Sequence, residues 1–281
     1  MRFKSRLRPD RVSEFLRVAQ LLDKVGKRCV LHLTAPEVDN VRIIFQADVS
    51  GSVAAYAHFA RSDWFQSYRI ESQNANQIGL EMDMQNLLRA LRSATAADHI
   101  LIKLAKKGVP VLAFEMMTPL GPIMQDIPVV VLSAIRLSEY QPPDHDRVSG
   151  FALPPLAKIH TLVDRMKVLC NSLHLKAILY DDRAKLSLGI DTDTASISAM
   201  FTDLSIASYE DDESHQEQQR STPIPEVEAV VDLRNFSRCL FGHQAQPLHA
   251  TCFIHSHYVM VHLTVSSDIS ISYYIPRKIS P

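Results

Sequence analysis

The strongest constraint on the fold is a repeat, because two segments 149 residues apart carry the same irregular pattern. One is Met82–Leu91 (MDMQNLLRAL) and the other is Val231–Leu240 (VDLRNFSRCL). In each, alternating apolar and polar residues lead to an aspartate, Asp83 or Asp232, and an amphipathic stretch follows. Alternation predicts a strand, and an aspartate before an amphipathic stretch is a preferred helix N-cap. Both segments are therefore predicted to be a strand that leads into a capped helix.

The flanking segments repeat as well. Each predicted helix is followed by two alternating strands, and each strand–helix unit is preceded by an amphipathic helix and three strands. In the first half we expect a helix at about 10–25 and strands at 29–34, 41–46, 52–59, 78–82, 100–104 and 109–115. In the second half we expect a helix at about 155–170 and strands at 173–180, 185–190, 195–201, 227–231, 250–254 and 258–265. Each half is then an α+β unit with two helices covering one face of antiparallel sheet, and the chain is predicted to be a tandem duplication.

Two polar stretches interrupt these patterns. The segment Gln141-Pro142-Pro143-Asp144-His145-Asp146 is typical of an exposed connector. It predicts a first domain at 1–137, a connector at 138–150 and a second domain at 151–281. The stretch 209–225 contains four consecutive acidic residues and is expected to be an acidic loop within the second half.

The composition argues against several classes of protein. The formal net charge is −1, so no global field attracts nucleic acid. Glycine is scarce, with 8 residues, and the sequence contains no glycine-rich phosphate-binding motif. The four cysteines are widely spaced and are expected to be reduced, buried thiols. No apolar run has the length of a signal peptide core or a membrane span, so we expect a cytosolic or nuclear protein without membrane association.

Positive charge is segregated locally, on the helix faces opposite the apolar stripes. On the first helix the stripe is formed by Val12, Phe15, Leu16, Ala19 and Leu22. The cations that the four helices direct away from the core are Arg17, Lys24, Arg89, Arg92, Lys158, Arg165, Arg234 and Arg238, with Lys158 and Arg165 nearer the flank of their stripe. Such a surface can bind phosphates without reading bases.

A simpler interpretation of these cations stays open, because exposed helix faces are commonly charged. Two acidic residues, Glu14 and Asp164, share the same faces and would weaken the field.

A duplicated half with two cationic helices on antiparallel sheet resembles the DNA sliding-clamp family typified by PCNA. The C-terminal run SYYIPRKI at 272–279 is similar to the ending of PCNA, with one residue fewer before the proline. The N-terminal MRF, the DIPV at 126–129 and the VDRMK at 163–167 resemble more specifically the Hus subunit of the checkpoint clamp, the nine-one-one heterotrimer. The resemblance covers essentially the whole chain.

The resemblance implies a PCNA-like fold and a non-catalytic role without cofactor. The chain would be one subunit of a nuclear ring that is loaded at damaged DNA and serves as a scaffold for checkpoint signalling and repair, and unassembled chain could also be cytoplasmic. Its partners would be two Rad-type clamp subunits, double-stranded DNA without sequence preference, a checkpoint clamp loader, and repair and signalling proteins. The eight helix cations would face the DNA.

The resemblance also implies where other molecules bind. Ring closure would use edge strands near 123–132 and 195–204. Clients would bind under the connector at 134–152, with Tyr273, Tyr274 and Pro276 as candidate groove residues; ordinary strand packing is an equal alternative for Tyr273. Near-neutral charge departs from the acidity usual in PCNA, which favours a mixed ring over a homotrimeric replication processivity clamp.

Two further clusters could indicate metal chemistry. The histidines at 243, 249, 255, 257 and 262 include a His-x-His pair, but no obvious ligand set completes them, and we interpret them as surface and turn residues. The carboxylates at 181–182, 191 and 193 could serve a two-metal nuclease, although aspartates are common at strand ends. A metal-dependent nuclease is therefore the least favoured alternative, and no catalytic or metal-binding residue is assigned.

Overall fold

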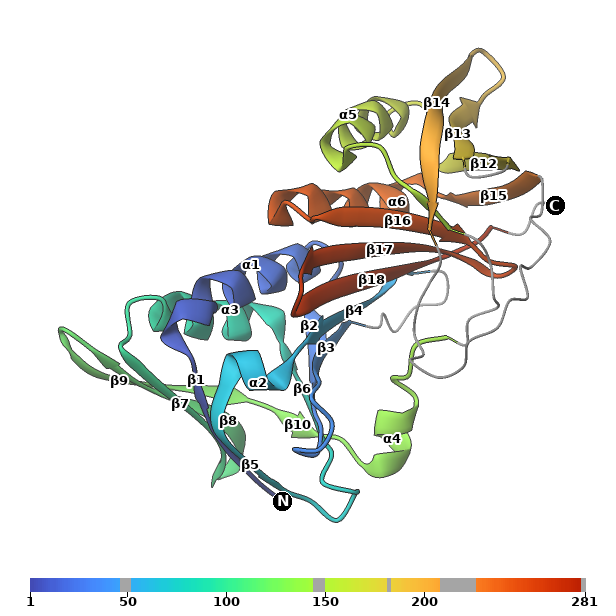
Figure 1. Cartoon of the computed structure of the whole chain (residues 1–281). Helices are drawn as coiled ribbons and strands as arrows, with labels where there is room; N and C mark the ends of the chain where they lie inside the picture. The colour runs from blue at the N-terminus through green and yellow to red at the C-terminus, as the bar shows by residue number, and fades with distance from the viewer. Residues whose placement is uncertain (46–51, 144–149, 181–182, 208–225, 279–281) are drawn as a thin grey trace. The chain divides into compact units, whose positions relative to one another are not determined.

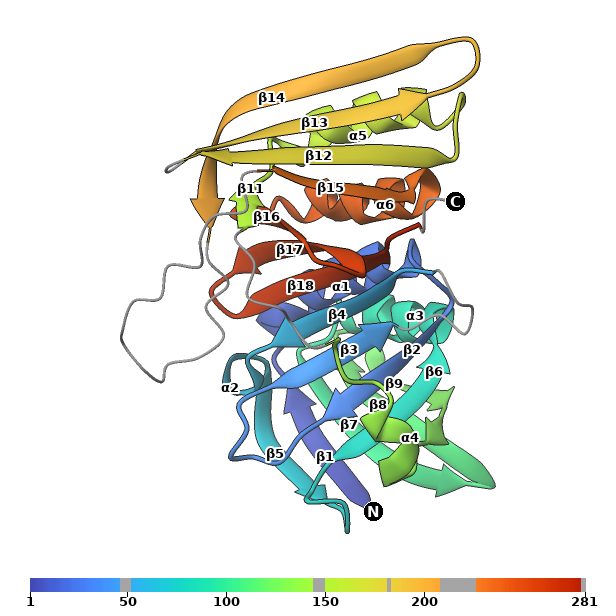
Figure 2. The same cartoon turned by 90° about the vertical axis from the view of Figure 1, so that its right-hand side faces the viewer.

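The structure of the chain is a computed structural model, and it describes residues 1–45, 52–143, 150–180, 183–207 and 226–278. These residues form two compact units. The first contains residues 1–45, 55–142 and 266–271, and the second contains the rest. Figures 1 and 2 show the chain from two directions, with α1 and α3 in the first unit and α5 and α6 in the second. The predicted domains 1–137 and 151–281 and the connector 138–150 stay a prediction.

The first unit has two antiparallel sheets. The five-stranded sheet has the order β5-β1-β7-β8-β9, and the other runs β10-β6-β2-β3-β4. The strands are β1 (Arg2–Leu7), β2 (Arg28–Leu33), β3 (Val41–Phe45), β4 (Ala54–Phe59), β5 (Phe65–Glu71), β6 (Ile78–Asp83), β7 (His99–Lys107), β8 (Val109–Thr118), β9 (Gly121–Pro128) and β10 (Val130–Val131). The helices are η1 (Pro9–Arg11), α1 (Val12–Asp23), α2 (Arg61–Trp64), α3 (Met84–Ala94) and α4 (Ala134–Ser138).

The second unit is also antiparallel, with the order β18-β17-β16-β11-β14-β13-β12-β15. Its strands are β11 (Gly150–Ala152), β12 (Ser172–Tyr180), β13 (Arg183–Asp191), β14 (Ser196–Ala207), β15 (Glu226–Asp232), β16 (His249–Ile254), β17 (Tyr258–Ser266) and β18 (Ile269–Pro276). The last residue of β17 and the first three of β18 belong to the first unit. Its helices are α5 (Leu156–Met166), α6 (Leu233–Leu240) and η2 (Phe241–Ala245). The chain is therefore α+β with antiparallel sheet, as predicted.

The aspartates in the repeat cap their helices as predicted. The carboxylate of Asp83 accepts hydrogen bonds from the backbone N–H groups of Gln85 (2.8 Å) and Asn86 (3.2 Å). Asp232 accepts from Arg234 and Asn235, both at 3.0 Å. These bonds satisfy N–H groups that have no partner inside the helix, so one local signal fixes the start of both α3 and α6.

Two predicted helices are shorter than expected. The first begins at Val12, because residues 9–11 form the 3-10 turn η1. The second ends at Met166 and not near Cys170, and in the turn that follows the N–H groups of Leu169 and Cys170 both donate to the carbonyl of Met166. The apolar residues beyond this turn, Val168 and Leu169, are exposed and extend no buried stripe.

Four elements of the first half were not predicted: β1, β5, α2 and α4. The count of two helices per half is therefore wrong for the first half, which has two additional short helices. A local signal was present for β1, whose residues are alternately exposed and buried. Helix α4 begins within the segment interpreted as a loop, because the Ser133 hydroxyl accepts a hydrogen bond from the N–H of Arg136.

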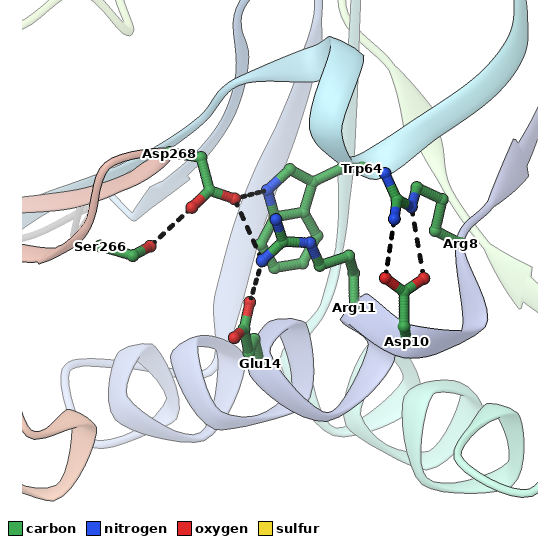
Figure 3. Close-up of polar contacts among 7 residues, drawn as sticks. All are labelled: Arg8, Asp10, Arg11, Glu14, Trp64, Ser266 and Asp268. Atoms are coloured by element: carbon green, nitrogen blue, oxygen red, sulfur yellow. Dashed lines mark hydrogen bonds and ion pairs between the residues drawn. The ribbon is translucent and has the colours of Figure 1, made fainter.

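A buried polar cluster fixes the start of α1 (Figure 3). The indole N–H of Trp64 donates to Asp268 at 2.8 Å, and the Ser266 hydroxyl donates to the other oxygen of the same carboxylate at 2.7 Å. The guanidinium of Arg11 lies 3.6 Å from Asp268 and 2.9 Å from Glu14. Trp64 has no exposed surface and also packs against Phe15 and Phe59.

Candidate nucleic-acid interface

All eight cations predicted on the helix faces are exposed on the surface of their units. Figure 1 shows the helices that carry them: Arg17 lies on α1, and Lys24 is its C-cap; Arg89 and Arg92 lie on α3, Lys158 and Arg165 on α5, and Arg234 and Arg238 on α6.

Helical periodicity explains this exposure. In α3 the residues Met84, Leu87, Leu88 and Leu91 are buried, and the arginines lie between these positions on the opposite side. In α6 the residues Leu233, Phe236 and Leu240 are buried in the same way. The apolar stripe that folds each helix against its sheet therefore also directs the cations to the free face.

Most of these cations are free to bind an external anion. Lys24 has an interaction within the chain. Within the described part of the chain, the other seven form no ion pair with an acidic side chain: Arg17, Arg89, Arg92, Lys158, Arg165, Arg234 and Arg238. A cation without an internal partner keeps its full attraction for phosphate.

The two acidic residues that share these faces are engaged by neighbours. Glu14 forms an ion pair with Arg11, and this hydrogen bond raises the pKa of Arg11. Asp164 accepts hydrogen bonds from Lys167 at 2.6 Å and from the Ser237 hydroxyl at 3.1 Å, with His160 at 3.6 Å. The hydrogen bond from Lys167 is the main reason that the pKa of Asp164 lies below its ordinary value. Local pairing thus reduces the opposing field that the sequence suggested.

Two strands leave backbone groups available for pairing. Strand β9 lies at the edge of the five-stranded sheet, where its ladder partner is β8. Strand β14 pairs with β13 over most of its length and with β11 only at Ile206 and Ala207. Within the described residues, 196–205 therefore have a ladder partner on one side only. These segments overlap the ranges 123–132 and 195–204 that were predicted to be edges.

The groove candidates lie mostly inside the protein. Tyr273 is 1% exposed and Tyr274 is 4% exposed, whereas Pro276 is half-buried. Burial raises the pKa of the Tyr273 hydroxyl, and Tyr274 packs edge-on against Tyr258. Strand packing, the alternative considered for Tyr273, therefore accounts for both rings, and only Pro276 retains surface for a bound client.

The histidine cluster differs from the prediction at one position. His255 is buried and its ring packs at a tilt against Tyr258, with ring centroids 4.4 Å apart, so it is not a surface histidine. His249 and His257 are exposed, as predicted, and His243 and His262 are half-buried with polar contacts to Leu240 and Ser272. Among the described residues, no group of three or more His, Cys, Asp or Glu side chains is arranged to hold a metal ion.

The structure describes only two of the four aspartates that were considered for a two-metal nuclease. Asp191 and Asp193 are exposed around the turn that follows β13. The aspartates at 181–182 and the acidic stretch 209–225 lie outside the described residues.

Burial raises the pKa of Cys29 and Cys252 to about 12, so both thiols are protonated at neutral pH. Cys239 is buried as well, whereas Cys170 is half-buried. In the described part of the chain, no helix is long and apolar enough to span a membrane.

Sequence reasoning missed a second set of cations. Arg2, Lys4 and Arg6 alternate with buried residues along β1 and are exposed. Their strict alternation was the signal that could have placed them together on one face of a sheet.

Comparisons with known proteins match nearly the whole chain. Residues 1–278 match the family described as Hus1-like protein. The checkpoint protein hus1 homolog of Dictyostelium discoideum is 28% identical over 98% of this chain and 98% of its own length. The human checkpoint protein HUS1 is 27% identical over 94% of this chain and 95% of its own, and the checkpoint protein hus1 of Schizosaccharomyces pombe is 26% identical over 95% and 93%.

Proposed function

Because this chain belongs to the Hus1-like family, a family of non-enzymatic checkpoint clamp subunits, we propose that it forms one third of a DNA-encircling ring with two Rad-type subunits. In this proposal the ring is loaded at damaged DNA in the nucleus by a dedicated loader and recruits repair and signalling proteins. The observation that carries the proposal is the family match across residues 1–278.

The helix surface supports the DNA-binding part of the proposal. The eight exposed cations lie on the four main helices, two to each helix, and the nearby acids Glu14 and Asp164 are paired internally. Exposed cations bind phosphates through a salt-dependent and sequence-independent attraction. A ring that slides along duplex DNA needs binding of this kind, because base-specific contacts would hold it at one site.

The free strand edges support assembly. We infer that β9 and residues 196–205 of β14 pair with strands of neighbouring subunits, because unpaired backbone groups at a sheet edge can extend the sheet into a second chain. The inference includes a PCNA-like fold in each half, with domains at 1–137 and 151–281, and clients that bind near the connector 138–150 and Pro276.

A homotrimeric processivity clamp is the alternative. The formal charge of −1 favours a mixed ring, because the subunits of the homotrimeric clamp PCNA are usually acidic and this chain is nearly neutral. The test is the mass of the purified chain by light scattering, alone and with the two Rad-type subunits. The proposal expects a chain that does not trimerise alone and forms a one-to-one-to-one complex in the mixture. A stable homotrimer supports the alternative, and no association in either case contradicts the ring.

The DNA surface is tested in the assembled ring. The double variant Arg89→Glu and Arg238→Glu reverses one helix cation in each unit. We expect it to weaken binding to a labelled duplex by about tenfold and to reduce the salt dependence. The matched control, Lys106→Glu and Lys185→Glu, makes the same charge change at exposed positions on strands β7 and β13. Equal loss in both variants, or loss in neither, contradicts the assignment of the helix faces to DNA.

A further inference from the structure

The five-stranded sheet of the first unit, whose strands are labelled in Figure 1, carries a line of cations on one face. Lys4 on β1 lies directly opposite Arg69 on β5 and also opposite Lys103 on β7. Because opposed residues of an antiparallel pair share a face, these three side chains lie side by side across three strands. Arg6 projects from the same face of β1, whereas Phe3, Ser5 and Leu7 project into the core.

This arrangement costs stability if the face has no partner. Like charges that lie directly opposite one another in a sheet repel. Lys103 is compensated by Glu115 at 2.5 Å, but within the described residues Lys4, Arg6 and Arg69 form no ion pair. These three side chains are exposed and can attract an external anion.

An apolar pocket adjoins these cations. It lies over β7, β8 and β9 and is lined by Leu101, Met117, Pro122 and Met124 together with Arg6 and Glu115. The strand register brings these residues together, because Arg6 is opposite Leu101, Leu101 opposite Glu115, and Glu115 opposite Met124. Met124 is 64% exposed and Met117 is 49% exposed. Exposed methionines form adaptable apolar contacts and are frequent on surfaces that bind peptides.

We propose that this face of the sheet binds an extended acidic protein segment, with its carboxylates on Lys4, Arg6 and Arg69 and a large apolar side chain in the pocket. Alternate residues of an extended peptide are about 7 Å apart, which matches the spacing of alternate residues along β1. The apolar pocket favours a peptide over duplex DNA, because the phosphate backbone that a duplex presents has no apolar group to bury there. The site is a face of the sheet and not the edge of β9, so it does not depend on ring formation.

The proposal is tested with the full chain, labelled with carbon-13 at its methionine methyl groups. The probe is a short peptide of alternating Glu and Ser with one Phe at its end. We expect its addition to shift the methyl signals of Met117 and Met124. The double variant Lys4→Gln and Arg69→Gln should weaken binding by about tenfold, and its resistance to urea should be unchanged or higher because a repulsion is removed. The control variant Lys106→Gln and Lys185→Gln should bind as the natural chain does.

The pocket is tested separately. The natural chain should bind the Phe-containing peptide more tightly than the same peptide with Ser in place of Phe. Met124→Ser should remove this advantage in affinity. The matched control, Leu120→Ser, changes a fully exposed apolar residue outside the pocket and should leave this advantage intact. Equal binding by the neutralised and natural chains overturns the proposal. So does an absence of methyl shifts, or shifts produced by duplex DNA and not by the peptide.

Discussion

The four main helices begin in two different ways. Helices α3 and α6 start at an aspartate that caps its own helix two and three residues downstream. Helices α1 and α5 have no side-chain cap. The start of α1 is fixed by Arg11, whose partners are Glu14 one turn away and Asp268 near the other end of the chain (Figure 3).

A helix start can therefore be set by neighbouring residues, as in α3 and α6, or by residues far apart in the sequence, as in α1. A cap contributes about 1 kcal/mol wherever its sequence occurs. A buried carboxylate with an indole, a hydroxyl and a guanidinium around it contributes only when distant segments have already come together. The comparison therefore predicts that disrupting the α1 cluster costs more than removing either cap.

The largest expected effect is that of Asp268→Ala. The substitution leaves the Trp64 N–H and the Ser266 hydroxyl without an acceptor in a site where Asp268 is 8% exposed. We expect the free energy of unfolding in urea to fall by about 3 kcal/mol. Trp64 is the single tryptophan of the chain, so its fluorescence reports on this site directly.

Two further variants test whether the loss of stability is specific to the buried carboxylate of Asp268. Asp268→Asn keeps an oxygen acceptor for Trp64 and should lose less stability than the alanine variant. Asp10→Ala removes an exposed carboxylate that pairs with Arg8 at 2.9 Å, and a surface pair of this kind contributes at most about 1 kcal/mol. If Asp268→Ala and Asp10→Ala prove equally costly, the cluster does not anchor α1.

The caps should give an intermediate effect. Asp83→Ala and Asp232→Ala are each expected to cost about 1 kcal/mol and to speed hydrogen exchange at the capped amides, Gln85 and Asn86 in α3 and Arg234 and Asn235 in α6. Asp→Asn at the same positions keeps an accepting oxygen and serves as the control. Exchange rates that are the same in the alanine and asparagine variants would show that capping does not set the helix starts.

The distinction between local and long-range determinants explains which parts of the fold could be predicted from the sequence. Helices α3 and α6 and the strands around them were predictable, because alternation and an N-cap aspartate are signals within a few residues. The short helices α2 and α4 were missed: α2 has no side-chain cap at all, and α4 is only five residues long. The contact between Trp64 and Asp268, 204 residues apart, has no local signal.

The candidate site residues also differ in whether a local sequence signal predicted their exposure or burial. Exposure of Arg89 and Arg238 followed from helical periodicity, and the structure confirms that exposure. Burial of Tyr274 and His255 did not follow, because alternation places neighbouring residues on opposite faces without showing that both faces are covered. The line formed by Arg69, Lys4 and Lys103 needs the register of three strands, which no single segment specifies.

The smallest expected effect concerns the contact between α5 and α6. Asp164 accepts hydrogen bonds from Lys167 and from Ser237 on α6, and its pKa lies below the ordinary value of 3.8, chiefly because of Lys167. A lowered pKa in the folded state means that the ionised carboxylate stabilises the fold above the ordinary value. This stabilisation is lost as the pH falls through that value to the folded pKa.

The matching variant is Asp164→Asn. Because the Asp164 side chain is 40% exposed, we expect it to lower the free energy of unfolding by less than about 1 kcal/mol at neutral pH. Relative to the natural chain this difference should shrink below the ordinary pKa of aspartate. The control is Asp193→Asn, which changes an exposed turn carboxylate and should show no comparable pH-dependent loss. A difference for Asp164→Asn that persists unchanged into acid would mean that packing between α5 and α6, and not the charge of Asp164, carries the contact.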